Sequence, residues 1–537
     1  MNRSPDEPPP TRRLFRRRWL RKPLFWLGVF VALVVVFYAE EDWRGRRDWN
    51  RYGQAMAARG VSVDFRDYIP KPVPAEENFA EAPIVKSWCL TFGSGFLTND
   101  LYTRATFNIS TTNIADKGHR HFVDLVAWQM ASVALQSGPL GDKQQFETDQ
   151  GSLAARAAAA PAVLEGMKPD EADFAAIRLA SARTNSRFPI QYDQEDPSRI
   201  LLPHLANIKS VCARLNLQAC AELAAGQPDK ALADEKLMLY LADSIKTEPM
   251  LISYLVRVAC LQIAVQPVWE GLAERRWTDS QLQELEQSFQ HYDFPADFDH
   301  AFQGEKTYMI RELDYVKKKG LAFMDSVGRA KLDFSTYSDF LDSVKPALHQ
   351  ASVNAVGRIA PAGWYDFERL NYCVLFDAQT KGVVDAAAAR FFPGQVASNH
   401  AEVAGQLRHE EWPTPLKFIV YHQAMASLLF DYGKSLPMRA AVLQTCANQA
   451  AIACALERYR LANGQFPETL GALTPRFISR LPNDVIGGQP YKYRRTADGQ
   501  FILYSVGWNE KDDGGAPGKK LFDEEEGDWV WDYPARQ

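Results

Sequence analysis

Seventeen consecutive uncharged residues, PLFWLGVFVALVVVFYA at positions 23–39, form a long apolar run near the start of the chain. That length reaches the lower end of what a membrane-spanning helix needs. Eight Lys and Arg residues precede the run within residues 1–22, and four follow it closely. By the positive-inside rule, this excess predicts a cytoplasmic tail at 1–22, a transmembrane helix at 23–39 and an extracytoplasmic body at 40–537. The lipid bilayer of the inner (cytoplasmic) membrane is the first expected partner.

A cleaved signal peptide is the alternative interpretation of the same run. Cleavage after Ala39 would place Phe37 at a position that requires a small residue, and two glutamates and an aspartate follow directly. The sequence therefore favours an uncleaved anchor.

Helical spacing dominates residues 119–435, where apolar side chains recur every three to four positions. The predicted helices include Leu153–Ala160 (interrupted by Pro161), Leu205–Ala225, Lys230–Ile245, Leu251–Leu272, Asp279–Tyr292, Asp297–Lys319, Tyr337–Ala347, Cys373–Arg390 and Pro415–Tyr432. One unit, Ala219–Ala233, looks like a tetratricopeptide hairpin, but no repeat of fixed length follows. The pattern predicts a mainly α protein with a helical-array body.

Two other regions differ from this body. Residues 40–118 predict a helix at Asp42–Gly60, an extended Pro-rich spacer at Ile69–Pro74 and one strand around Tyr102–Ile109. Residues 437–537 predict a long helix at Pro437–Ala462 and a short one at Phe466–Leu473. Two alternating runs, 491–495 and 501–506, flank Asp498-Gly499, which is a hairpin signal. The chain is expected to end in a small α+β module.

The order of features in this last module resembles the C-terminal part of type II secretion major pseudopilins (protein G). The residues that carry the resemblance are Ala455–Arg460, Asn463-Gly464, Phe466-Pro467, Leu470, Leu473, Leu481-Pro482, Asp484, Gly488, Pro490-Tyr491, Tyr493, Leu503–Ser505, Gly507 and Asp512–Gly515. The resemblance implies a helix packed on a small antiparallel sheet, and a calcium-binding loop after its strands. In pseudopilins the module directly follows the N-terminal apolar helix, whereas about 400 residues intervene here.

The rest of the chain resembles a group of membrane-anchored bacterial proteins of unassigned activity that end in the same module. The residues concerned are Pro72–Pro74, Asn78-Phe79, Tyr192-Asp193, Leu202–Leu205, Leu241–Ser244, Glu248-Pro249, Leu251–Ser253 and Leu255–Arg257. This resemblance implies architecture and no activity.

The acidic C-terminus is the candidate metal site. From Glu510 to Gln537 there are nine acidic and four basic residues. Calcium prefers six to eight oxygen ligands in a flexible loop, and Asp512, Asp513 and Asp528 could supply carboxylates. A solvated acidic tail is the other interpretation. Trp529 and Trp531 favour an ordered end that packs on the sheet.

Composition excludes two classes of protein. Hydrophobic residues are 46% and charged residues 24% of the chain, which excludes a mostly disordered polypeptide. Residues 1–22 carry a net charge of +6 and the remainder −11, so nucleic acid is not an expected partner of the body. The seven cysteines fall mostly within helical patterns and are expected to be buried helix residues.

Catalytic signals are sparse. His119-Arg-His121, His300 with Glu305, and Arg408–Glu411 are isolated from other ligand-type residues. A polar cluster in the helical body is the main enzyme candidate, made of Arg187, Asp193, His204, Asp243, Glu248 and Arg257. The same residues could instead form salt bridges between the loop 185–203 and the helices.

Three functional hypotheses follow. The first is a non-catalytic, membrane-anchored scaffold or binding protein. The second is an accessory protein of a type II secretion or pilus-like system, which would meet pseudopilins or other envelope proteins through the shared module. The third is a hydrolase that acts from the helical body.

Overall fold

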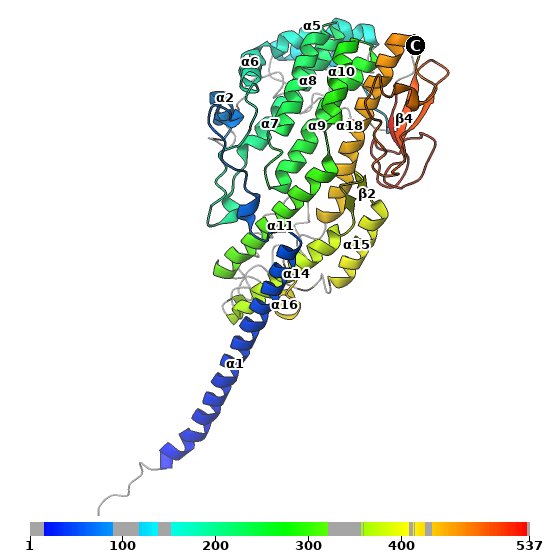
Figure 1. Ribbon diagram of the computed structural model, residues 1–537. Helices are drawn as coiled ribbons and strands as arrows, with labels where there is room; N and C mark the ends of the chain where they lie inside the picture. The colour runs from blue at the N-terminus through cyan, green and yellow to red at the C-terminus, as the bar shows by residue number, and fades with distance from the viewer. Residues whose placement is uncertain are drawn as a thin grey trace, which may run out of the picture. The chain divides into compact units, whose positions relative to one another are not determined.

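The computed structural model describes residues 15–89, 118–137, 152–319, 356–357, 359–407, 412, 414–424 and 432–533. Within them the chain is mostly helical, with a few small antiparallel sheets and an apolar helix near the N-terminus (Figure 1). The predicted mainly α class is confirmed. The tetratricopeptide-like and pseudopilin-like details stay predictions. The predicted strand at Tyr102–Ile109 and the predicted helix at Tyr337–Ala347 lie outside the described residues.

The chain divides into two compact units, each made of separate stretches of sequence. Unit 1 consists of Met1–Val63, Leu313–Val374 and Leu407–Leu428. Unit 2 consists of Asp64–Glu312, Leu375–Gln406 and Leu429–Gln537. The five consecutive segments predicted from the sequence, with boundaries after residues 22, 39, 118 and 435, stay a prediction.

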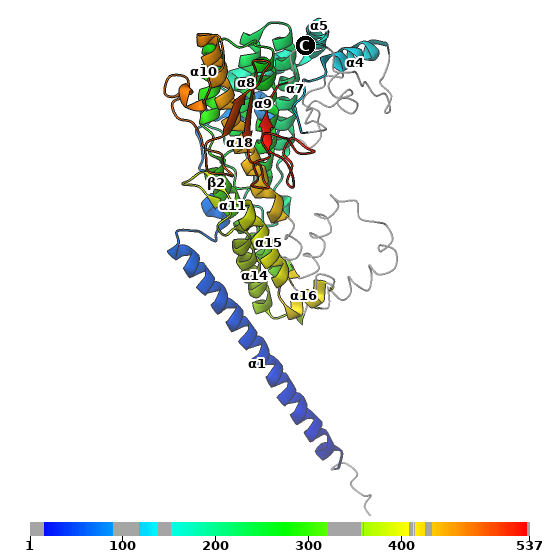
Figure 2. The ribbon, with the colours of Figure 1, turned by 90° about the vertical axis from the view of Figure 1, so that its right-hand side faces the viewer.

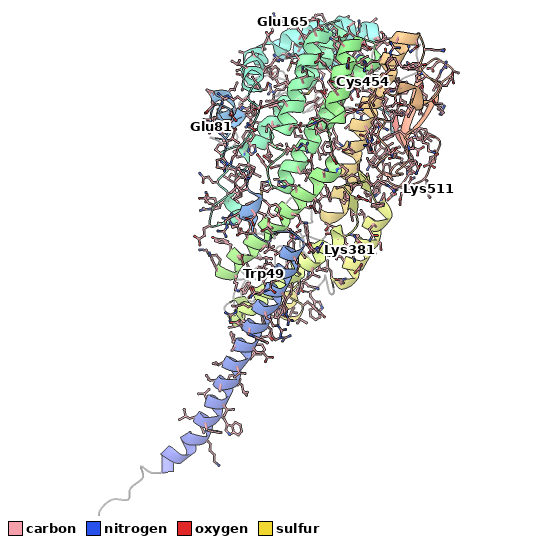
Figure 3. All side chains as sticks on the ribbon, in the orientation of Figure 1. Trp49, Glu81, Glu165, Lys381, Cys454 and Lys511 are labelled. Carbon is pink, nitrogen blue, oxygen red and sulfur yellow. The ribbon has the colours of Figure 1, made fainter. Side chains whose placement is uncertain are left out.

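Helix α1, Phe15–Ala58, dominates unit 1 and joins the predicted anchor to the predicted helix behind it without a break. Its apolar side chains between Leu24 and Phe37 are exposed, apart from the half-exposed Val29. Gly60 adopts a positive φ of 74°, a conformation that ends helices and suits glycine. Figure 3 labels Trp49 on this helix, and the Arg369 guanidinium lies 4.2 Å from the centre of its ring.

Two helices among the described residues are long and apolar enough to cross a membrane. The apolar window of α1, in the stretch Lys22–Ala58, is entirely unburied, whereas that of α9, Leu251–Ala273, is 67% buried. We therefore regard α9 as a core helix. The apolar segment of α1 has the properties of a membrane anchor or a signal sequence.

A helical array forms the core of unit 2. It contains α4 (Leu125–Ser137), α5 (Leu153–Met167), α7 (Pro203–Ala224), α8 (Pro228–Asp243), α9 and α10 (Asp279–Gln290). Each helix packs on its neighbours: α4 on α5, α5 on α7, and α7 and α8 on each other and on α9. Thr278 and Gln281 form a complete capping box at the start of α10, which satisfies two N–H groups that would otherwise lack partners.

Helix α18, Tyr432–Asn463, lies between this array and the sheet, because it contacts α9, α10 and strand β4. Its buried stretch from Ala440 to Leu456 is rich in alanine, which lets neighbouring elements approach closely. Cys454, labelled in Figure 3, is one of the six buried cysteines; they lie on α7, α9, α14 (Ala362–Thr380) and α18, as expected.

The sheet has the order β3-β4-β5, with both pairs antiparallel (Figure 2). Strands β3 (Lys492–Arg495) and β4 (Phe501–Ser505) form the predicted hairpin, and Gly499 in its turn has a φ of 76°. Strand β5, Trp529–Trp531, pairs with β4 and is completely buried. The expectation that Trp529 and Trp531 pack on the sheet is confirmed.

The remaining helices and strands complete the two units. They are η1 (Phe65–Tyr68), η2 (Phe79–Glu81), α2 (Pro83–Ser87), η3 (Lys168–Asp170), α6 (Glu171–Ala180), η4 (Pro197–Arg199), α11 (Phe294–Lys319), α14 (Ala362–Thr380), β1 (Val384–Asp385), β2 (Arg390–Phe391), α15 (Pro393–Gln406), α16 (Thr414–Val420) and η5 (Leu470–Leu473).

Several local predictions are wrong. The helix predicted at Pro415–Tyr432 ends at Val420, and the short helix predicted at Phe466–Leu473 is a single 3-10 turn at Leu470–Leu473. Helix α5 continues through Pro161, because packing on α4 and α7 outweighs the one backbone hydrogen bond that proline cannot make. The helix predicted at Cys373–Arg390 ends at Thr380, and Gly382 with a φ of 66° turns the chain into the hairpin β1–β2.

Candidate functional site

The structure separates the predicted polar cluster into three parts. His204 meets Glu248, and Arg257 meets Asp243. Arg187 instead donates from Nε to the Pro70 carbonyl over 2.9 Å, and Asp193 is exposed. The six residues therefore do not form one catalytic site.

Glu248 is the centre of the first part. It lies in the connection between α8 and α9 and is 5% exposed. Its Oε1 lies 2.8 Å from His204 Nε2, and its Oε2 accepts a hydrogen bond from the Ser253 hydroxyl. Both carboxylate oxygens thus have partners, which lowers the cost of burying the group.

Local sequence explains how these three side chains meet. Pro203 suits the first position of α7 and places His204 in the first turn of that helix. Ser253 lies in the first turn of α9, five residues after Glu248. The ring of Phe188 stacks on His204 at 4.2 Å between centroids and 21° between planes, which fixes the imidazole plane.

A cavity of about 580 Å³ adjoins this cluster. Its lining consists of Cys89, Pro189, Ile190, Gln191, Gln194, Ser198, Arg199, Leu201, Pro203 and His204. His204 is fully buried from solvent, its Nε2 faces Glu248, and its Nδ1 has no hydrogen-bond partner among the described residues. The two glutamines and the apolar side chains of the lining suit a small amphipathic ligand with amide or hydroxyl groups.

Cys89 provides the thiol in the lining of this cavity, but its chemistry opposes catalysis. Burial, together with the negative charges of Glu248 and Glu81, raises the pKa of the Cys89 thiol to about 11. Catalytic cysteines have the opposite shift, because nearby positive groups stabilise the thiolate. The arrangement is therefore better suited to binding than to nucleophilic attack.

The second part of the cluster is an ion-pair network that joins α8, α9 and α11. The Arg257 side chain is 2% exposed and pairs with Asp243 at 2.9 Å and with Asp297 at 2.7 Å. Two carboxylates on one buried guanidinium satisfy most of its N–H donors. Arg257 and Asp243 thus form salt bridges between helices, which is the structural alternative to a catalytic role.

The predicted calcium ligands take part in hydrogen bonds and an ion pair within and beside their loop. Asp528 is buried and accepts the backbone N–H groups of Gly515 at 2.6 Å and Asp513 at 3.3 Å. Asp512 pairs with Lys492 at 3.2 Å and accepts the Tyr504 hydroxyl at 3.1 Å. Across the described part of the chain, no three His, Cys, Asp or Glu side chains are grouped as metal ligands would be. Calcium would have to replace these hydrogen bonds, and a site at Asp512, Asp513 and Asp528 stays a prediction.

The other histidine signals have structural roles where they are described. His119 Nδ1 lies 2.7 Å from Asp532 Oδ2, and the His121 carbonyl accepts from Gln266. His300 packs against the Tyr68 ring, while Glu305 accepts the Leu251 N–H. Residues 408–411 lie outside the described residues.

Several charged groups were not recognised from the sequence. Arg156 and Glu270 form a completely buried ion pair between α5 and α9. Glu222 and Asp234 are buried close together, and burial raises the pKa of each, to about 8 and about 7. These pairs join residues 114 and 12 positions apart, and no sequence motif indicates them.

No known protein family, curated protein or solved structure matches the chain. The resemblance to pseudopilins thus rests on the sequence features alone, and function must be argued from the geometry.

Proposed function

We propose that the chain is a non-catalytic binding protein, anchored in the cytoplasmic membrane by one helix. Residues 23–39 span the bilayer, residues 1–22 stay in the cytoplasm, and residues 40–537 lie outside it. The net charge of −11 beyond residue 22 supports a partner other than nucleic acid.

The observation that carries this proposal is helix α1. Its apolar side chains, such as Leu27, Phe30 and Leu33, are 56%, 63% and 64% exposed, which is unfavourable in water and favourable in lipid. The helix then continues to Ala58 without interruption, so the span is rigidly connected to folded structure.

Support for binding comes from the cavity beside His204. Its volume is typical of small-ligand sites, and its lining combines apolar surface with a few polar groups. The raised pKa of Cys89 leaves little thiolate at neutral pH and argues against a hydrolase that would use this cysteine as its nucleophile.

Membrane fractionation tests the anchor. We expect the full-length protein to remain with the membrane after a salt wash and to keep its full size. A soluble product of the size of residues 40–537 would instead identify a cleaved signal peptide.

Cavity-filling variants test the binding role. Leu201 lines the cavity and is 58% exposed, so Leu201→Trp should fill its mouth without disturbing the core. Native mass spectrometry of the detergent-solubilised full chain should detect a bound small molecule that Leu201→Trp loses. Leu179→Trp, at an exposed leucine on α6, is the matched control and should keep the ligand. Equal ligand content in both variants would contradict the assignment.

A second candidate is an accessory role in a type II secretion or pilus-like system. The order of a long helix, α18, followed by an antiparallel sheet that packs on it favours this role, since it matches the arrangement that the resemblance implies. Site-specific cross-linking from exposed residues of β3 to the major pseudopilin of the same cell would test it. Absence of any cross-link during active secretion would count against the role.

A further inference from the structure

Within unit 1, residues at and before the start of α14 contact α1 where its apolar segment ends. The Phe37 ring, two residues before the end of that segment, contacts the Trp364 ring edge-on at 6.4 Å between centroids. The Tyr38 hydroxyl donates to the Ile359 carbonyl. The start of α14 and the residue Ile359 before it therefore lie beside the last apolar turn of α1, at the same position along the axis of that helix.

Close backbone packing fixes this height. A Cβ atom on Gly363 would lie 2.0 Å from the Glu41 carbonyl oxygen, so only glycine permits the observed approach. The Gly363 N–H donates to Asp42 Oδ1 over 2.8 Å, and the Trp364 indole N–H donates to Glu41 Oε2 over 3.1 Å. Because these polar contacts begin directly beyond Ala39, they mark the expected boundary between lipid and water.

Helix α16 extends the same surface. Its Phe418 ring packs on Trp364 and Tyr365 at 6.1 and 4.9 Å between centroids. Farther along, Asn371 donates to the carbonyls of Tyr421 and His422. The His422 ring, just beyond the end of α16, packs on Phe367 at 5.2 Å and on Trp364 at 5.6 Å. Taken together, the contacts of residues 418–422 advance along α14 in the same direction as the residue numbers.

Helix α14 in turn rises along α1 away from the lipid. Asp42 meets Gly363 and Trp49 meets Arg369, so residue numbers increase together along both helices. The beginning of α16, which includes Leu416, is consequently the end nearer the membrane.

Apolar side chains are exposed at this end. Ile359 is 65% exposed and Leu416 is 43% exposed, while Val420, one turn farther along α16, is 50% exposed. Trp364 adds an aromatic ring whose N–H is already satisfied, the amphipathic arrangement that favours membrane interfaces.

We propose that Ile359, Trp364 and Leu416 form a lipid-contact surface that rests in the outer leaflet beside the anchor. The proposal depends on the membrane anchor proposed above. Lipid is the occupant because α1, which meets this surface through Phe37 and Tyr38, enters the bilayer at the same height. The surface holds unit 1 against the membrane, with its apolar side chains roughly 5–10 Å deep, at the boundary between headgroups and acyl chains.

Depth-dependent fluorescence quenching tests the surface in the full-length protein. Single cysteines are introduced by Ile359→Cys, Leu416→Cys, Val420→Cys, Leu33→Cys and Arg51→Cys in a Cys89→Ser background, in which the other native cysteines are buried. Each variant is labelled with an environment-sensitive dye and reconstituted into phosphatidylcholine vesicles. The vesicles carry a nitroxide quencher either near the headgroup or deep in the acyl chain.

We expect positions 359 and 416 to be quenched more by the shallow nitroxide than by the deep one, and position 420 to be quenched less than 416. Position 33, inside the span, should show the reverse preference. Position 51, whose side chain is 70% exposed on α1 beyond the contact region, should be quenched by neither.

The outcomes separate the two proposals. Quenching at 33 without quenching at 359 and 416 overturns the lipid-contact surface and leaves the anchor intact. No quenching at 33 overturns the anchor. Protection of 359 and 416 from an aqueous quencher without quenching by lipid would show that protein, such as a second copy of the chain, covers the surface, and would also overturn the proposal.

Discussion

Removing the Glu270 carboxylate should destabilise unit 2 strongly, because this side chain joins three segments of the core. Glu270 is completely buried on α9 and pairs with Arg156 of α5. Its Oε1 also accepts the Val123 N–H at 2.6 Å and the Gln266 amide at 2.9 Å. Glu270→Ala therefore leaves a buried guanidinium with Glu274, at 3.4 Å, as its remaining carboxylate contact.

The magnitude follows from these contacts. Breaking a buried ion pair from one side costs about 3–5 kcal/mol. An unpaired buried N–H costs about 1–3 kcal/mol, although the two terms overlap here. We expect a loss of about 4 kcal/mol, which raises the local unfolding constant about a thousandfold, since each 1.4 kcal/mol is a factor of ten.

Native-state proteolysis of the detergent-solubilised full chain, with cleavage sites mapped to α5 and α9, measures this local stability. Glu284→Ala, which removes an exposed pair with Lys236, is the control and should cost about 0–1 kcal/mol. The double variant Arg156→Met, Glu270→Met should recover most of the loss, because it leaves no unpaired buried charge. A Glu270→Ala effect no larger than that of Glu284→Ala would refute the reasoning.

Three further predictions concern other parts of the chain. Burial raises the pKa values of Glu222 and Asp234 to about 8 and about 7, so the folded state binds more protons than the unfolded state. The stability of the folded state should therefore fall as the pH rises from about 5 to 8. Melting curves recorded across this range should show the decrease, and Glu222→Gln should make it smaller. Gly363→Ala should loosen the α1–α14 contact and cost about 1–3 kcal/mol by overpacking, whereas Gly405→Ala in α15, which has open space around it, should be neutral or slightly stabilising; equal protease sensitivity of the two would contradict the packing. Asp528→Ala should lower the melting temperature without calcium, because the Asp528 carboxylate accepts two backbone N–H groups. If the loop rearranges to bind calcium, the ion should raise the melting temperature of the unmodified protein; Asp512→Ala or Asp513→Ala should remove that rise, and Glu525→Ala should not.

Local chemistry made much of the fold predictable. Proline or capping residues mark the starts of α7, α8 and α10, and Gly60, Gly226 and Gly464 end their helices with positive φ. These signals act within a few residues, so sequence alone reveals them. Pro161 misled the prediction of α5 because its tolerance depends on tertiary packing.

The candidate site was less predictable for the same physical reason. The sequence indicated that His204, Glu248, Asp243 and Arg257 belong to a polar cluster, and two pairs among them do form. It could not show that Arg187 turns toward the Pro70 carbonyl or that Cys89 lines the cavity with His204. Those contacts depend on how distant helices and loops pack.

Topology mapping tests the central claim, an extracytoplasmic protein held by α1, most directly. A reporter enzyme that is active only outside the cytoplasm is fused after Gln537 and assayed in intact cells, and the size and membrane retention of the fusion are measured in parallel. We predict an active reporter on a full-length fusion that remains in the membrane after a salt wash. An inactive reporter on a stable, full-length fusion would contradict the orientation, and an active reporter on a shortened, soluble product would contradict the anchor.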